Sequence, residues 1–237
     1  MVITAYASGS SGNLYKIDNG RTQVLIECGV AYKKVQQYLH YKIHDISGVL
    51  VSHEHRDHSK AVKDLLHIGK DIYTSKGTAI ALKADNEPSL HIVESKKPFQ
   101  IGSFVITPFD TQHDAAEPLG FVIADDKDKL LFATDTYYLK YRFTGLTQIM
   151  IECNHSYKII DQNVSEGFLN KVLASRLVKS HFSLENVKKW LTENDLSQVE
   201  EIWLLHLSNL NSDADVFKKE IAAMTGLPVY IAGGKNE

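Results

Sequence analysis

Four residues of the kinds that bind metal ions lie within one six-residue stretch, His53-Glu54-His55-Arg56-Asp57-His58. The apolar run before it, residues 46–52, predicts a buried strand, and the apolar positions after it recur at helical spacing from residue 61 to 66. The stretch therefore lies in a loop that leaves a strand and enters a helix. Such a loop can direct alternate imidazoles at one metal ion and the Asp-His pair at a second. Imidazole and carboxylate ligands suit Zn²⁺ or Mn²⁺.

The composition is that of one globular domain, which we expect to span residues 1–237. The net charge of −3 argues against a chain that is basic throughout, but it is compatible with a local basic face. Two cysteines, Cys28 and Cys153, are too few for a disulfide framework and favour a reducing compartment. The start of the chain is not typical of a signal peptide, and no apolar run reaches transmembrane length. We therefore expect a cytoplasmic protein that does not contact the membrane.

The periodicity predicts short strands and turns in the first half of the chain and longer helices in the second. Strands are expected at residues 2–7, 14–17, 23–26, 72–73, 90–93, 104–108, 120–124, 129–133, 148–151, 202–205 and 229–231. One helix is predicted to run through residues 164–173, and another follows a cap at Ser183. Two mainly β halves, each with helices, predict an α/β protein with two packed sheets and helices outside.

Three later residues extend the set of candidate metal ligands. His113, Asp135 and His206 each lie at or just past the carboxyl end of a predicted strand. Metal sites are commonly built at such ends, because the loops converge there. Taken singly, each residue is better explained as a surface group or a hydrogen-bonded core group. Together with the opening stretch, they predict a complete set of ligands for two metal ions.

These motifs resemble the metallo-β-lactamase fold, an αββα four-layer sandwich with its active site along one edge. The resemblance covers the whole chain and rests on Leu25–Gly29, the 53–58 stretch, His113, Thr134–Thr136 and His206. It implies that His53, His55 and His113 bind one metal ion, that Asp57, His58 and His206 bind the other, and that Asp135 bridges both. The family usually has Asp where this chain has Glu27, a position that supports a ligand without binding metal.

Further segments resemble the YycJ-type (WalJ) exonucleases within this fold: residues 7–13, 152–155, 181–186 and 206–208. The resemblance implies that His181 lies near the scissile phosphate and protonates or stabilises the leaving oxygen. Asn13, His155 and Lys179 are the residues we expect to bind substrate. For His155, a hydrogen-bonded loop histidine is an equally good interpretation.

The charge pattern around His181 is a separate observation. Between Phe168 and Trp190 the chain has five basic residues against the single acid Glu185: Lys171, Arg176, Lys179, Lys188 and Lys189. A surface that binds the phosphates of a nucleic-acid backbone has this excess of basic residues. A solvated helix face explains any one of these lysines equally well.

The sequence thus predicts metal-assisted hydrolysis of phosphodiesters by a DNA exonuclease, with His181, Asp57 and Asp135 as catalytic residues and two divalent ions, Zn²⁺ or Mn²⁺, as cofactors. A phosphodiesterase for cyclic nucleotides or other small diesters is the closest alternative. A non-catalytic nucleic-acid-binding subunit is a third. The expected partner is DNA or a small phosphodiester, and the sequence is compatible with a homo-oligomer.

Overall fold

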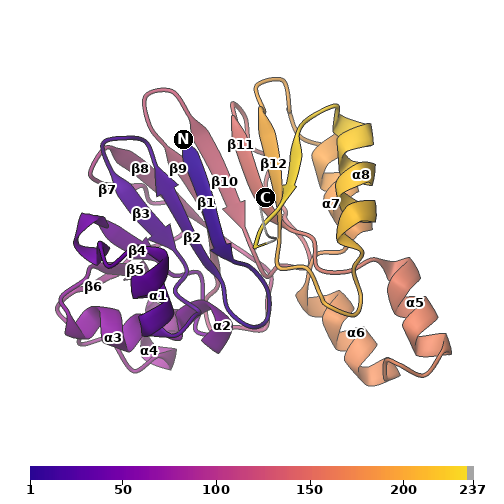
Figure 1. The fold of residues 1–237 in the computed structure, drawn as a ribbon, viewed down its shortest axis with the longest axis horizontal. Helices are drawn as coiled ribbons and strands as arrows, with labels where there is room; N and C mark the ends of the chain where they lie inside the picture. The colour runs from indigo at the N-terminus through magenta and orange to yellow at the C-terminus, as the bar shows by residue number, and fades with distance from the viewer. Residues whose placement is uncertain (234–237) are drawn as a thin grey trace. The chain divides into compact units, whose positions relative to one another are not determined.

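The computed structural model describes residues 1–233 of the chain, which form two compact units (Figure 1). Unit 1 comprises residues 1–110, 115–128 and 233, and unit 2 comprises residues 111–114 and 129–232. Every helix within residues 1–233 is too short or too polar to cross a lipid bilayer. A single domain over residues 1–237 stays a prediction.

The first sheet of unit 1 has six strands in sequence order: β1 Val2–Ala7, β2 Leu14–Asp18, β3 Gln23–Ile26, β4 Gly48–Leu50, β5 Ile72–Thr74 and β6 Leu90–Ile92. The first three strands are antiparallel, and β3 to β6 are parallel. The Asn19-Gly20 turn closes the β2–β3 hairpin, with Gly20 at a φ of 80° that a side chain would disfavour.

Helices cover one face of this sheet: α1 Tyr32–Tyr38, η1 Ile43–Asp45, α2 Arg56–Ser59, α3 Val62–His67 and α4 Lys76–Ala81. Val35 of α1 and Leu65 of α3 pack with Leu25 and Val49 of the sheet in one buried cluster. The helical spacing of the apolar residues therefore marks core faces. Three further strands of unit 1 are antiparallel: β7 Phe99–Ile101, β8 Phe104–Asp110 and β9 Leu119–Ala124.

Unit 2 is built on four parallel strands in sequence order: β10 Lys129–Ala133, β11 Gln148–Glu152, β12 Glu201–Leu205 and β13 Val229–Ile231. Their central residues form nearly unbroken buried apolar runs, as expected of parallel strands covered on both faces. Because the strands are parallel, their carboxyl ends lie along one edge. Residues that follow β10, β11 and β12 are thereby brought together.

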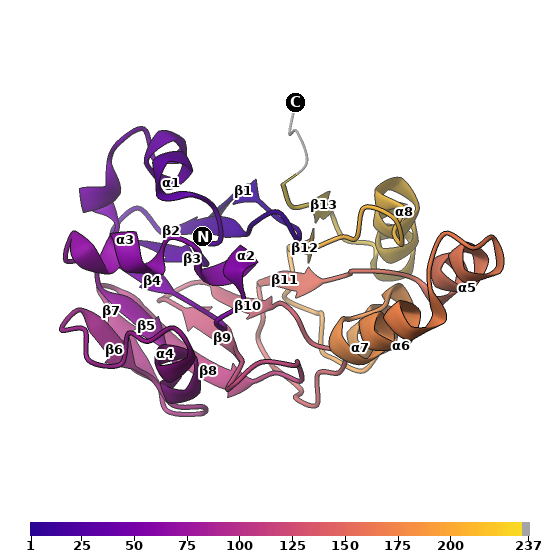
Figure 2. The ribbon, with the colours of Figure 1, turned by 90° about the horizontal axis from the view of Figure 1, so that it is seen from below.

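Four helices belong to unit 2: α5 Tyr157–Ser165, α6 Lys171–Ser180, α7 Leu184–Thr192 and α8 Ala214–Thr225. A side chain caps the start of each helix by accepting a backbone N–H, and the capping residues are Ser156, Asn170, Ser183 and Asp213. Figures 1 and 2 both show α5 as the helix of this unit that lies farthest from its strands.

The prediction of one helix through residues 164–173 is wrong. The structure ends α5 at Ser165 and begins α6 at Lys171. Gly167 adopts a φ of 79° in the turn, and the Asn170 side chain accepts a hydrogen bond from the backbone N–H of Val172. Both features stop a continuous helix, although the apolar spacing passes over them. The cap at Ser183 is confirmed.

Candidate metal centre

The ligand run of unit 1 follows β4, and its last residues form α2. The His53 and His55 rings meet edge to face with centroids 4.6 Å apart, and the His53 and His58 centroids are 4.2 Å apart. His53 and His58 are almost completely buried. Burying imidazoles together is costly without a shared partner, so this packing is typical of metal ligands.

Two residues from earlier loops hold this run in place. The backbone N–H of Asn13 donates to the Asp57 carbonyl at 2.8 Å, and its side-chain amide nitrogen lies 3.1 Å from the same oxygen and 3.2 Å from His58 Nε2. A Cβ atom on Gly29 would lie 1.6 Å from the Asp57 carbonyl oxygen. Only glycine allows the two loops to approach so closely.

Glu27 supports the same run from the end of β3. Its Oε1 atom lies 3.4 Å from His58 Nδ1, and its Oε2 atom accepts a hydrogen bond from the Ser52 backbone N–H. Ser52 Oγ in turn lies 2.8 Å from His53 Nδ1. A partner at Nδ1 fixes the His53 ring and directs its Nε2 toward a metal ion, which is the usual arrangement around ligating histidines. Glu27 therefore contacts His58 directly and is linked to His53 through Ser52.

The candidate ligands of unit 2 come from separate strand ends. His113 lies in the short segment 111–114, Asp135 follows β10, and His206 follows β12. His113 Nε2 lies 3.4 Å from one Asp135 oxygen, and His206 Nδ1 lies 3.8 Å from the other. Asp135 thus has a histidine beside each carboxylate oxygen, which is the geometry expected of a bridging ligand.

Backbone conformation sets these ligands apart from their neighbours. Asp135 and His206 adopt left-handed φ values of 43° and 52°, and Glu27 in unit 1 has 63°. Such a conformation costs a residue with a Cβ about 1–3 kcal/mol and concentrates at functional sites. The strain therefore supports a functional role for Asp135 and His206.

Glu152 is a buried carboxylate that the sequence analysis did not assign a role. It ends β11. Oε1 accepts a hydrogen bond from His181 Nδ1 at 2.6 Å and lies 3.6 Å from His206 Nδ1, and Oε2 accepts from the backbone N–H groups of Thr136 and Phe182. The neighbouring strands β10 and β12 both lead into candidate ligands. Glu152 also lies at a strand end, and the strand order that places it between Asp135 and His206 is the signal that the sequence alone lacked.

Glu152 and His181 shift each other's charge state. Burial alone would raise the pKa of Glu152, but the adjacent His181 and the hydrogen bonds lower it overall. Burial would likewise lower the pKa of His181, but the charge and hydrogen bond of Glu152 raise it. The pair therefore favours a carboxylate and a protonated imidazole whose Nε2–H remains to be donated.

The arrangement fits divalent metal ions. One nitrogen or oxygen atom from each of four residues lies within 4.8 Å of the others: Asp135, Glu152, His181 and His206. Because Glu152 and His181 are hydrogen-bonded to each other, Asp135 and His206 are the candidate ligands of this cluster. His113 donates from Nδ1 to the Ser180 carbonyl at 2.8 Å, which leaves Nε2 for a metal ion. Burial lowers the pKa of His113 and so favours the neutral, ligating imidazole.

The three predicted substrate-binding residues occupy different surroundings. Asn13 is fully buried behind the unit 1 ligand run, and Lys179 is exposed on α6. His155 is fully buried, neither of its ring nitrogens has a hydrogen-bond partner within residues 1–233, and burial lowers its pKa to about 4. Direct contact of these residues with substrate stays a prediction.

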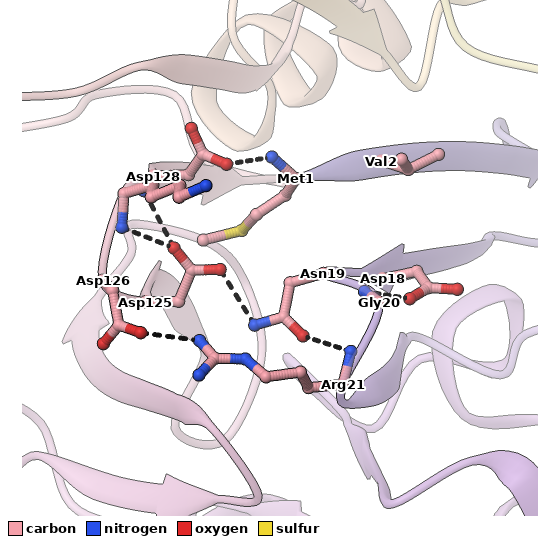
Figure 3. Close-up of a pocket in the computed structure, with 10 residues that line it drawn as sticks. Met1, Val2, Asp18, Asn19, Gly20, Arg21, Asp125, Asp126 and Asp128 are labelled. Atoms are coloured by element: carbon pink, nitrogen blue, oxygen red, sulfur yellow. Dashed lines mark hydrogen bonds and ion pairs between the residues drawn. The ribbon is translucent and has the colours of Figure 1, made fainter.

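Unit 1 also has a cavity of about 740 Å³ that lies outside the candidate ligands (Figure 3). Its lining groups are already paired with one another. Arg21 Nη2 lies 2.8 Å from Asp126 Oδ2, Asn19 donates to Asp125, and the amine of Met1 pairs with Asp128. The cavity therefore offers no open set of ligands.

Comparison with known proteins identifies relatives along most of the chain. Residues 22–195 match the family described as a beta-lactamase superfamily domain. Exodeoxyribonuclease WalJ of Streptococcus pneumoniae serotype 2 (strain D39 / NCTC 7466) is 30% identical over 234 residues, covering 92% of this chain and 84% of that protein. Exodeoxyribonuclease YycJ of Bacillus anthracis is 27% identical over 233 residues, covering 92% and 85%.

Solved structures of other proteins have the same fold as this chain. The metallo-beta-lactamase fold protein YhfI from Bacillus subtilis has a TM-score of 0.72 at 19% identity and covers 97% of this chain and 95% of its own. Zn²⁺-bound PqqB from Methylobacterium extorquens also has a TM-score of 0.72, at 13% identity, and covers 98% and 97%. At these identities the likeness shows the fold alone. It confirms the metallo-β-lactamase fold that the sequence predicted.

Proposed function

Because the chain belongs to the beta-lactamase superfamily and, within it, to the family of the WalJ and YycJ exodeoxyribonucleases, we propose that it is a metal-dependent DNA exonuclease. The observation that carries this proposal is the cluster at the carboxyl ends of β10, β11 and β12. There, a candidate bridging carboxylate, Asp135, lies beside the hydrogen-bonded pair of Glu152 and His181. Ligands and a proton donor are the two parts that phosphodiester hydrolysis needs.

The proposed ligands of two divalent ions are His53, His55, Asp57, His58, His113, Asp135 and His206. Support comes from the donor set of imidazoles and carboxylates and from the partners that orient the His53, His58 and His113 rings. Zn²⁺ and Mn²⁺ both suit this set. Ions bound there would supply Lewis-acid activation of a water nucleophile and of the phosphodiester.

The protein groups would move the protons. His181 would donate its Nε2 proton to the leaving oxygen, because its Nδ1 proton is held by Glu152. The carboxylates of Asp57 and Asp135 are the proposed acceptors for the proton of the attacking water. Glu152 would act as a positioning residue that fixes the His181 ring and favours its protonated form.

The substrate proposal is DNA, and the ion pairs of the basic segment support some of its residues over others as the contacts to phosphate. Arg176 is paired with Asp114, and Lys188 is paired with Glu220. Within residues 1–233 Lys171, Lys179 and Lys189 have no carboxylate partner, so these three are the cations of the segment that best fit backbone phosphates.

A small diester that contains a base is the second candidate substrate. Tyr137 and Tyr138 follow the Asp135 loop with 41% and 53% of their surface exposed. The backbone N–H of Tyr137 donates to the Gln112 carbonyl, and the Thr136 hydroxyl donates to the Tyr138 carbonyl, so the backbone that carries both rings is held in place. An exposed aromatic pair beside the ligands suits a single base as well as a strand of DNA.

The buried, unpaired thiols of Cys28 and Cys153 support a reducing compartment, and we propose that the protein acts in the cytoplasm.

The test is a side-by-side assay of the Mn²⁺-loaded protein on linear DNA, RNA, cyclic mononucleotides and a chromogenic phosphodiester. We expect the highest kcat/KM on linear DNA, with mononucleotides released from an end. Cyclic nucleotides cleaved far faster than DNA would replace the exonuclease proposal with the small-diester alternative.

A further inference from the structure

Large apolar side chains are exposed in and around the turn between α5 and α6. Phe168 is 73% exposed, Val172 is 79% exposed, and Leu210 on an adjoining loop is 72% exposed. The small core beneath the two helices is formed by other residues: Ile160, Leu169 and Ala174, with Val164, Leu177 and Val178. The exposed side chains are therefore not needed to hold the hairpin together.

The backbone that carries Phe168 is fixed. The Phe168 and Leu169 N–H groups both donate to the Asn163 carbonyl, and the Asn163 side chain donates to the Leu210 carbonyl at 2.8 Å. A large aromatic side chain on a rigid turn presents contact area at a low cost in conformational entropy.

The outward face of α6 is basic. Lys171, Ser175 and Lys179 recur every four residues, so they lie in a row along the helix, and Val172 and Arg176 lie beside that row. All five are exposed. The helix has no acidic residue.

The same helix ends at the candidate active site of unit 2. His181 is its C-terminal cap, and the carbonyl of Ser180 accepts a hydrogen bond from His113 Nδ1. Arg176 Nη2 lies 2.9 Å from Asp114 Oδ2, so the outward face of α6 borders the His113 loop. The exposed basic residues of α6 thus lie along the chain between Phe168, before the helix, and His181, at its end.

We propose that α6 and the preceding turn bind a single strand of nucleic acid, with its phosphates on Lys171 and Lys179 and an unstacked base against Phe168. This inference rests on the proposed nuclease function and names how the same site receives its substrate. A ten-residue helix is about 15 Å long, so the bound strand must extend several nucleotides beyond the scissile bond. Base stacking on an aromatic side chain is tolerant of sequence, which suits a general exonuclease.

Charge favours this occupant over a second copy of the chain. A two-fold symmetric contact through α6 would place the lysine row of one copy against the same row of the other. A polyanionic strand instead releases counterions when it covers these cations. The Arg176–Asp114 pair is exposed, and such pairs contribute little, so a phosphate can compete for Arg176.

The test measures binding of a phosphorothioate-protected, fluorescein-labelled single strand to the metal-loaded protein by fluorescence anisotropy. Phe168→Ala should raise Kd about tenfold, in line with the loss of one stacked base, and Phe168→Trp should restore it. Lys171→Glu should also weaken binding and lower the slope of log Kd against log salt by about one phosphate contact.

The matched control is Val105→Ala, which removes a half-exposed apolar side chain from β8 of unit 1. It should leave Kd unchanged. Blunt duplex DNA has no unstacked base, so its binding should respond to Lys171→Glu but not to Phe168→Ala. Circular dichroism and thermal unfolding of each variant establish that it is folded.

The outcomes separate this inference from the proposed function. A protein that degrades DNA but binds the single strand equally well with Phe168→Ala keeps its function and overturns the inference. A protein that binds the strand through Phe168 but cleaves no DNA keeps the inference and overturns the function. If Phe168→Ala turns a dimer into a monomer, or abolishes binding to anionic vesicles, without changing strand affinity, the surface serves a second copy or a membrane and the inference is wrong.

Discussion

The two units present their candidate ligands in opposite ways. In unit 1 the ligands lie within six consecutive residues, and Asn13 and Gly29 from earlier loops position the run. In unit 2 the ligands come from separate strand ends, and Asp135 and His206 adopt strained backbone conformations. The first set is a local motif, whereas Asp135 and His206 meet because the parallel strands β10, β11 and β12 share an edge. We therefore expect that single substitutions in unit 2 will distinguish metal binding, proton donation and positioning from one another more clearly than substitutions in unit 1 will.

Asp135→Ala should have the largest effect, because it removes the proposed bridging ligand that two histidines of unit 2 approach. Activity on DNA should fall by more than the ~10–100-fold expected for a residue that only orients a ligand. Elemental analysis should show reduced metal content. Full activity in this variant would contradict the bridging role.

His181→Ala should retain its metal ions and lose turnover. General acid catalysis is typically worth about 10²–10⁴-fold, so kcat on DNA should fall by that factor. A nitrophenyl diester should lose much less, since its leaving group needs little protonation. Equal losses on both substrates would rule out a role in leaving-group protonation.

Glu152→Gln and Glu27→Gln form a matched pair of supporting carboxylates, one in each unit. Glu152→Gln keeps the shape but removes the charge beside His181, so activity should fall about 10–100-fold with metal retained. The variant's rate should begin to fall at a lower pH than the wild-type rate does as pH is raised. The reason is that Glu152 no longer raises the pKa of His181, which acts in its protonated form. Glu27→Gln should instead weaken metal affinity, since Glu27 contacts His58.

If both variants lost metal to the same extent and kept the same pH–rate profile, the two carboxylates would share one role. Glu27→Asp restores the residue usual in the family and should change activity less than Glu27→Gln does.

His155→Leu should change acid stability more than activity. Burial lowers the pKa of His155 to about 4, against about 6.5 in an unfolded chain. Between these values the unfolded chain binds a proton that the folded chain does not, so the free energy of unfolding decreases as pH falls. At pH 5 this linkage amounts to about 2 kcal/mol.

The measurement is urea unfolding at pH 7.5 and pH 5. Wild type should lose about 2 kcal/mol more over this interval than His155→Leu. An identical pH dependence in the two proteins would show that His155 is protonated while buried. A large loss of DNA cleavage at pH 7.5 would favour the predicted contact of His155 with substrate.

The difference between the units also explains what the sequence could predict. The 53–58 run needs only a strand before it and a helix after it, and both were visible in the apolar spacing. His113, Asp135 and His206 were found because each follows a predicted strand. Glu152 is the last residue of its strand, where it is hard to distinguish from an ordinary strand end without knowing that β10 and β12 are its neighbours.

The α5–α6 turn shows why periodicity alone was insufficient. Val164, Phe168 and Val172 have helical spacing, yet Gly167 and Asn170 interrupt the helix and leave Phe168 and Val172 exposed. The apolar pattern alone predicts one continuous helix, whereas the turn residues within it determine the structure. The surface that we propose for the DNA strand was hidden by that interpretation.

The most direct test of the account is to count metal ions and measure DNA degradation on the same reconstituted samples. Wild type should hold two divalent ions per chain, and DNA degradation should disappear on chelation and return with Mn²⁺. Asp57→Ala, from the local motif, and Asp135→Ala, from the strand ends, should each hold fewer ions and lose activity. A wild-type protein that holds no divalent ion, or that degrades DNA equally well after chelation, would contradict the account.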